Sequence, residues 1–141
     1  MQETIQHRWQ FHCSPDQVWD YLTRSELIEQ WLMKNDFQPQ LGHKFRFTYK
    51  AKDGSYEGVV NCEVLEIKPM KRLSYSWNGK SMVGDGSFTS KVSWLLVPNE
   101  GGTELQLSHE GFVNMDDFLN HKNGWASCLK KMEAIFEKVQ S

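Results

Sequence analysis

The sequence predicts an α+β domain in which a curved, mostly antiparallel sheet packs against one long C-terminal helix. Strand-like alternations of apolar and polar residues fill the middle of the chain, and two short helical segments follow the first strand. An amphipathic pattern over residues 121–139 closes the chain. Strands that run together before a final helix are typical of the α+β class. At 141 residues, the chain has the size of a single domain, residues 1–141.

The pattern of residues in the N-terminal part of the chain predicts one strand and two short helices. Apolar residues alternate with polar ones over residues 4–13, the period of a strand with one buried face. Ser14 is followed by proline and, three residues on, by Gln17, which is a capping-box start for a helix that reaches about Thr23. Ser25 is expected to cap the second helix.

Five further strands are expected, joined by hairpins. Asp53-Gly54 has the composition of a tight hairpin turn, and residues 78–87 contain three glycines and predict a mobile loop at the rim of the sheet. The apolar phase changes between Val64 and Leu65, which indicates a β-bulge that bends the sheet. The expected strands are residues 44–50, 56–67, 73–77, 92–96 and 105–109.

The C-terminal pattern predicts a helix with a single apolar stripe. Trp125, Leu129 and Met132 recur at three- and four-residue spacing. Gly124 stands beside the first of them and costs about 1 kcal/mol relative to alanine in a helix. We therefore expect Gly124 to allow a close approach or a bend where the helix crosses the sheet. Asp116-Asp117, at the start of this helix, is expected to stabilise the exposed N–H groups and the helix dipole.

The widths of the two layers predict an interior space. Six strands at about 4.8 Å spacing make a sheet of roughly 25 to 30 Å, whereas a helix with its side chains is only about 10 to 12 Å across. Curvature and the two short helices must close the remainder, and any shortfall becomes a cavity. Aromatic residues make up 13% of the chain, with six tryptophans and eight phenylalanines. Such a cavity would have aromatic walls.

Composition excludes several classes of function. Lys and Arg number 16 against 18 Asp and Glu, so neither nucleic acid nor an anionic membrane is an expected partner. Three widely spaced cysteines form no C-x-x-C pair, which argues against disulfides and zinc and favours a reducing, cytoplasmic setting. Signal-peptide, transmembrane, metal-binding and dinucleotide patterns are absent, and no cofactor is expected.

The predicted inner faces supply the candidate ligand-binding residues. His109 continues an apolar strand face, where it is either a histidine satisfied by its neighbours or a polar anchor for a ligand. Aromatic residues at strand or helix spacing usually belong to a packed core, so the same residues could either fill the core or line a ligand pocket. The expected cavity-lining residues are Trp31, Phe45, Phe47, Tyr49, Tyr75, Trp77, Val92, Trp94, Leu107, His109, Trp125, Leu129 and Met132.

Seven short motifs occur in an order that resembles a known superfamily. They are Ser14-Pro15 through Val18-Trp19 with Leu22-Thr23, Glu26-Leu27-Ile28-x-x-Trp31, Gly42-x-x-Phe45, Gly58 through Ile67-x-Pro69, Leu73-x-Tyr75-x-Trp77, Val92-x-Trp94-x-Leu96 through His109-x-Gly111-Phe112, and Gly124-Trp125-x-x-x-Leu129. This order resembles the helix-grip (START, Bet v 1-like, SRPBCC) superfamily. Within it, the chain is similar to the C-terminal domain of the activator of the 90-kDa heat-shock protein's ATPase.

The resemblance implies a helix-grip fold with six or seven strands and leaves three functions open. The first is binding of a small hydrophobic or amphipathic ligand between the sheet and the last helix. The second is a cyclase or hydrolase of a polyketide-like or aromatic ligand, with His109 as acid or base and Tyr49 or Tyr75 polarising a carbonyl. The third is a co-chaperone-like interaction protein with a chaperone partner and a part in the stress response. Either a monomer or a homodimer fits all three.

Overall fold

A seven-stranded sheet and three helices make up the described part of the chain. The computed structural model describes residues 3–50, 57–80 and 87–140. In chain order the elements are β1 (Glu3–Phe11), α1 (Pro15–Thr23), α2 (Ser25–Trp31), β2 (Lys34–Asn35), β3 (Lys44–Lys50), β4 (Glu57–Lys68), β5 (Arg72–Lys80), β6 (Ser87–Asn99), β7 (Gly102–Phe112) and α3 (Met115–Gln140).

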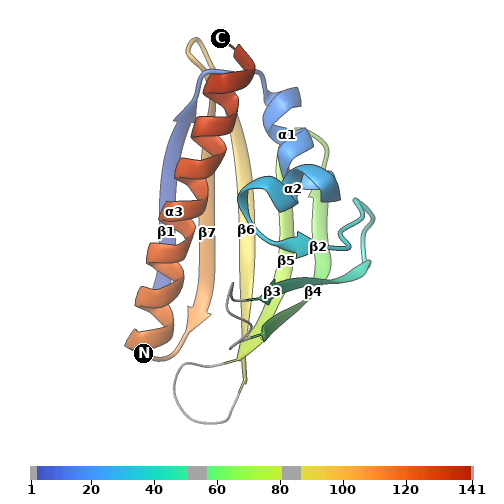
Figure 1. Ribbon diagram of the computed structural model, residues 1–141, viewed down its shortest axis with the longest axis vertical. Helices are drawn as coiled ribbons and strands as arrows, with labels where there is room; N and C mark the ends of the chain where they lie inside the picture. Colours follow the sequence, from blue (N-terminus) through green and yellow to red (C-terminus); the bar gives the residue numbers. More distant parts are fainter. Residues whose placement is uncertain (1–2, 51–56, 81–86, 141) are drawn as a thin grey trace.

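The strands form one antiparallel sheet in the order β1-β7-β6-β5-β4-β3-β2. Figure 1 shows α3 lying along the face of the sheet over β1 and β7, with α1 and α2 beside it and the β3–β4 end curling away from α3. The predicted α+β class, the curved antiparallel sheet and the long C-terminal helix are therefore confirmed. The very short strand β2 was not among the expected strands.

Two of the predicted turns fall on parts of the chain that are not described. The Asp53-Gly54 hairpin lies outside the described residues, and so do residues 81–86 of the predicted loop. Residues 78–80, expected in that loop, instead extend β5. The predicted bulge is confirmed, because the register between β4 and β5 shifts between Val64 and Glu66.

The start of α1 follows the prediction, whereas the start of α2 does not. Ser14 caps α1 with its side-chain oxygen, which accepts the Gln17 N–H at 3.4 Å. The N-cap of α2 is Arg24, which makes no capping bond through its side chain. The expected cap, Ser25, is the first helical residue, and its hydroxyl donates to the backbone oxygen of Asn35 at 2.8 Å.

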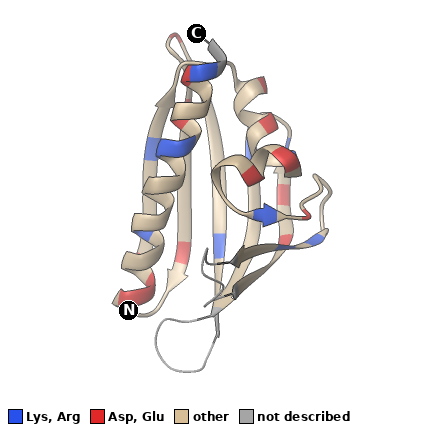
Figure 2. Ribbon diagram, in the orientation of Figure 1, with Lys and Arg blue, Asp and Glu red and all other residues tan. Residues whose placement is uncertain are grey.

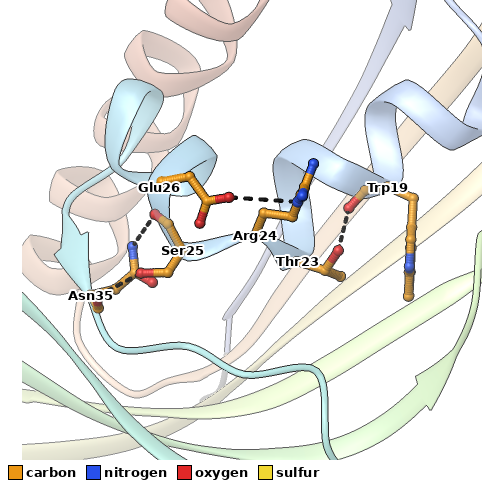
Figure 3. A network of polar contacts seen from close by, with 6 residues as sticks. All are labelled: Trp19, Thr23, Arg24, Ser25, Glu26 and Asn35. Carbon is orange, nitrogen blue, oxygen red and sulfur yellow. Dashed lines mark hydrogen bonds and ion pairs between the residues drawn. The ribbon is translucent and has the colours of Figure 1, made fainter.

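A side-chain network explains the different role of Ser25. The amide of Asn35 donates to the backbone oxygen of Ser25 at 3.3 Å, and Figure 3 shows the two residues facing each other. In the same region, the Thr23 hydroxyl donates to the backbone oxygen of Trp19 at 2.8 Å. Ser25 therefore joins the start of α2 to β2, a contact across ten residues that local capping rules do not encode.

The first turn of α3 is capped by a residue that the sequence analysis did not single out. The side-chain oxygen of Asn114 accepts the Asp117 N–H at 2.8 Å, and its amide donates to the Asp117 carboxylate at 2.7 Å. Asp117 is buried, while Asp116 is exposed. Both carboxylates lie in the first turn, where the helix dipole favours negative charge.

The close approach expected at Gly124 is wrong. Gly124 is exposed, and a Cβ atom built there would meet nothing within 4 Å. No close approach to the sheet therefore depends on this glycine. The adjacent Trp125 points the other way, into the core, with Leu129, Met132 and Phe136 following it along the buried stripe of α3.

Candidate functional site

The predicted cavity-lining residues converge on the inner face of the sheet, with one exception. Tyr49, at the end of β3, is 50% exposed. Of the other twelve, His109 is a fully buried polar residue, and eleven are buried members of one hydrophobic core: Trp31, Phe45, Phe47, Tyr75, Trp77, Val92, Trp94, Leu107, Trp125, Leu129 and Met132.

Aromatic rings at the centre of this core contact one another, either tilted or edge to face. The Trp125 ring lies 5.2 Å from that of Trp77 and 5.4 Å from that of Trp94, measured between centroids. Trp94 in turn meets Trp31 of α2 at 5.8 Å. Such contacts add to the free energy of apolar burial. In this conformation the side chains pack against each other across the space between the sheet and the helices.

His109 is the centre of a buried polar chain within these aromatics. The Trp125 indole N–H donates to Nδ1 of His109 at 2.9 Å. Because an indole N–H can only donate, Nδ1 is the acceptor and the proton of the neutral ring is on Nε2. This Nε2–H faces the Ser90 hydroxyl at 2.7 Å, and Ser90 donates to the backbone oxygen of Trp77 at 2.8 Å.

Burial holds His109 in its neutral form. The ring is fully buried, and desolvation, together with the nearby His121, lowers its pKa to about 3. Both ring nitrogens have partners from the chain itself, as expected of a histidine satisfied by its neighbours. A reacting group could reach neither nitrogen without breaking one of these bonds.

A second histidine, which the sequence analysis missed, extends the cluster toward the surface. His121, in the first half of α3, lies 5.5 Å from His109 between ring centroids and is only partly buried. Its Nε2 accepts the Trp77 indole N–H at 3.3 Å, and its Nδ1 bonds the backbone oxygen of Asp117 at 2.9 Å. Desolvation lowers the pKa of His121, although Asp117 opposes the shift.

The phenol and two thiols of the interior are also uncharged near neutral pH. The Trp94 indole donates to the Tyr75 hydroxyl at 3.0 Å, and burial raises the pKa of that phenol. Burial likewise raises the pKa of the Cys62 and Cys128 thiols. Figure 2 shows charges of both signs distributed over the ribbon, and most of these residues are exposed.

The described residues offer no metal site, and none of their helices could cross a bilayer. Within residues 3–50, 57–80 and 87–140, no three His, Cys, Asp or Glu side chains gather as metal ligands would. The same part of the chain contains no helix with the length and apolar character of a membrane span.

The long helix held against a curved antiparallel sheet, with two short helices after the first strand, defines a helix-grip domain. The chain belongs to the family described as Activator of Hsp90 ATPase homolog 1-like protein, whose model matches residues 12–137. The curated proteins that were compared contain no match.

Solved structures agree with this assignment. Protein MLL2253 from Mesorhizobium loti is 36% identical, with a TM-score of 0.84 over 96% of this chain and 98% of that one. The AHSA1 protein SPO3351 from Silicibacter pomeroyi is 20% identical, with a TM-score of 0.81 over 96% and 98%. CalU16 from Micromonospora echinospora is 21% identical, with a TM-score of 0.70 over 96% and 74%. The last two likenesses concern the fold alone.

Proposed function

We propose that this domain binds a small, uncharged, largely apolar molecule between the sheet and α3, at the end where Trp77, His121 and Trp125 meet. The observation that carries the proposal is the polar network of two histidines and two indoles embedded in the aromatic core. An aliphatic core would need no such network, and a partly satisfied one destabilises a fold. Titratable groups with strongly shifted pKa values cluster at binding sites.

The electrostatics of the interior determine which ligands fit. His109, His121, Tyr75 and the two thiols beside them are neutral near pH 7 for the reasons given above. An ionised ligand would lose its hydration, and the buried carboxylate beside this cluster, that of Asp117, is already bonded to Asn114. Burying a ligand charge here therefore costs far more than burying a neutral group. The ligand is therefore uncharged, with polar atoms that accept or donate single hydrogen bonds.

The contact between Trp77 and His121 is the place where a ligand's polar atom enters the network. It is the longest of the side-chain bonds in the cluster, at 3.3 Å, and His121 is partly exposed. A ligand oxygen would accept the Trp77 indole N–H in place of His121. Because the core side chains already contact one another, binding also requires the rings of Trp77 and Trp125 to move apart.

Binding is favoured over catalysis because the network offers no free acid or base. Both nitrogens of His109 are bonded within the fold, and the phenol of Tyr75 remains protonated. The chaperone partner implied by the resemblance and the cytoplasmic location inferred from the cysteine pattern stay predictions.

Native mass spectrometry of the freshly purified protein tests the proposal directly, together with saturable binding of the uncharged dye Nile red. Trp77→Phe removes the indole N–H and keeps an aromatic ring, and we expect it to weaken binding several-fold. Trp9→Phe is the matched control, because the Trp9 indole donates to Glu133 on the far side of α3. No retained molecule and no saturable dye binding, or equal binding by both variants, would contradict the proposal.

A further inference from the structure

The start of α3 fixes which nitrogen of His121 carries a proton. Nδ1 of His121 lies 2.9 Å from the backbone oxygen of Asp117, four residues earlier in the same helix. A carbonyl oxygen can only accept, so Nδ1 is the donor. The other nitrogen, Nε2, lies 3.3 Å from the indole nitrogen of Trp77, which can only donate. Both contacts therefore assign the same neutral tautomer, with the proton on Nδ1 and a lone pair on Nε2.

The surroundings of His121 keep Nε2 an acceptor. The opposite tautomer would place the lone pair of Nδ1 against the carbonyl oxygen of Asp117, so that two acceptors would face each other. A protonated ring would instead direct an Nε2–H at the indole N–H of Trp77, so that two donors would meet. Desolvation also lowers the pKa of His121, although Asp117 opposes the shift. Near neutral pH, Nε2 of His121 therefore accepts a hydrogen bond and does not donate one.

Trp77 and His121 thus place a donor and an acceptor side by side at the junction of β5 and α3. In this conformation they satisfy each other. A ligand atom that only accepts would take the indole N–H and leave Nε2 without a donor. A ligand atom that only donates would take Nε2 and leave the indole N–H without an acceptor. Each loss costs free energy, whereas a hydroxyl oxygen avoids both, because it accepts through a lone pair and donates its own proton.

The neighbouring part of the network already uses a hydroxyl in this bridging role. The Ser90 hydroxyl accepts the Nε2–H of His109 at 2.7 Å and donates to the backbone oxygen of Trp77 at 2.8 Å. Ser90 and His109 are both buried. A hydroxyl held between one donor and one acceptor therefore fits the packing of this core.

We propose that the ligand of the interior site is an alcohol or phenol whose hydroxyl bridges Trp77 and His121. This inference rests on the function proposed above and adds the chemical class of the ligand. The hydroxyl oxygen accepts the indole N–H of Trp77 and donates its proton to Nε2 of His121. The apolar body of the molecule lies beside the rings of Trp77 and Trp125.

The bridge requires a small opening between the sheet and α3. Two hydrogen bonds of ordinary length around one oxygen hold the two nitrogens roughly 4.5 to 5 Å apart. Trp77 and His121 must therefore separate from their 3.3 Å contact. A ketone of the same skeleton can enter the same opening, but it supplies an acceptor only and leaves Nε2 unpaired. The site should therefore prefer an alcohol to the matching ketone.

Displacement of Nile red by matched alcohols and ketones tests this preference. The pairs are indanol and indanone, tetralol and tetralone, and fluorenol and fluorenone, all of them uncharged. In the pairs that bind, the alcohol should bind at least about five-fold more tightly, because His121 is partly exposed and its unpaired Nε2 costs near the low end of the usual range. Saturable Nile red binding without displacement by any alcohol, or with ketones that bind as tightly, overturns the proposal. Absence of Nile red binding contradicts the interior site itself, so the two failures are distinguishable.

Two substitutions separate the acceptor from the donor. His121→Phe removes the acceptor and should abolish the preference for the alcohol. Trp77→Phe removes the donor, so both members of a pair should bind more weakly while the alcohol keeps its advantage through His121. His12→Phe is the matched control, because His12 is exposed and bonds the backbone oxygen of Gly101 in the β6–β7 hairpin. A preference that persists in His121→Phe would show that the shape of the alcohol, and not Nε2, is recognised.

The tautomer itself can be measured without a ligand, which decides the matter if His121→Phe does not fold. Side-chain ¹⁵N NMR correlations of the unchanged protein distinguish the two neutral forms of each histidine. Near neutral pH we expect the proton of His121 on Nδ1, and that of His109 on Nε2, as an internal comparison. A proton on Nε2 of His121 would overturn the proposal, because the site would then present two donors and favour the ketone.

Discussion

At the scale of single residues, His109 makes the stability of the fold depend on pH. Its pKa is about 3 in the native state and near 6.5 when unfolded. Between these values the unfolded chain binds more protons, so stability is full above about pH 6.5 and falls as the pH is lowered. The slope should approach about 1.4 kcal/mol per pH unit in the middle of this window, where the unfolded histidine is protonated and the native one is not.

Urea unfolding at several pH values between about 7 and 4.5 measures this slope. His109→Gln keeps an acceptor for Trp125 and a donor for Ser90 but does not titrate, so its slope should be clearly smaller than that of the unchanged protein. His121 contributes in the same direction in both proteins. Equal slopes would mean that His109 is protonated in the native state far more easily than its burial implies.

The Trp125 side chain should contribute more to the free energy of unfolding than the burial of its apolar area alone would give. Trp125→Phe keeps an aromatic ring in the core but leaves Nδ1 of His109 without a donor. An unsatisfied buried acceptor costs about 1 to 3 kcal/mol, in addition to the lost packing. Trp9→Phe, whose indole is only partly buried, should cost less. Comparable losses of unfolding free energy in the two variants would argue against an important Trp125–His109 bond.

The sequence predicts which residues are buried better than it predicts how their polar atoms pair. Period-two alternation places Trp77 and His109 on inner faces, because burial depends on local periodicity. Their partners depend on strand register, which pairs Trp77 with Ser90 and Val92 with His109. A serine at position 90, in phase with the apolar residues of β6, was the available indication of a buried hydroxyl and was missed.

At the scale of elements, the two halves of α3 meet at a position of low helix propensity. Gly124 faces solvent with open space around it, so Gly124→Ala should stabilise the fold by about 0.5 to 1 kcal/mol. Gly102 is the opposite case, because its φ is +130° and an added Cβ would collide with the backbone oxygen of Phe11. Gly102→Ala should therefore destabilise the fold. Thermal and urea unfolding of both variants measure the two signs, and destabilisation by Gly124→Ala would contradict the open space around this position.

Local rules predicted the elements that local interactions specify. The alternating strands, the Ser14 cap and the bulge after Val64 depend on neighbours in the sequence, and each is confirmed. Ser25 was wrongly expected to cap α2, because its hydroxyl bonds a residue ten positions away. The two-residue strand β2 is too short to produce a periodic pattern.

At the scale of the whole molecule, the sheet and α3 are held together by different kinds of interaction. Strand β4 is paired with β3 on one side and β5 on the other. Helix α3 is attached through side chains, among them the bonds from Trp9 to Glu133 and from Trp125 to His109. One helix is narrower than a seven-stranded sheet and covers only part of its face. Side-chain packing therefore fills the space that α3 leaves uncovered.

This difference predicts unequal protection of two cysteines. Cys62 lies in β4 and Cys128 in α3, and burial raises the pKa of both thiols, which slows alkylation of the native protein. Cys62 should react only through global unfolding, with a rate that rises steeply with urea. Cys128 should react through local displacement of α3, with little dependence on dilute urea, because a local opening exposes little surface.

Mass spectrometry of iodoacetamide-treated protein, resolved by site, measures the two rates. The variants Cys62→Ala and Cys128→Ala, each of which lacks one of the two cysteines compared, serve as controls for effects of one modification on the other. The proposed interior ligand enters where α3 meets the sheet, so a bound ligand should slow the reaction of Cys128. The rate at Cys62 should still rise steeply with urea. If both cysteines follow the same steep dependence, α3 does not open separately from the sheet, and entry of a ligand must take another route.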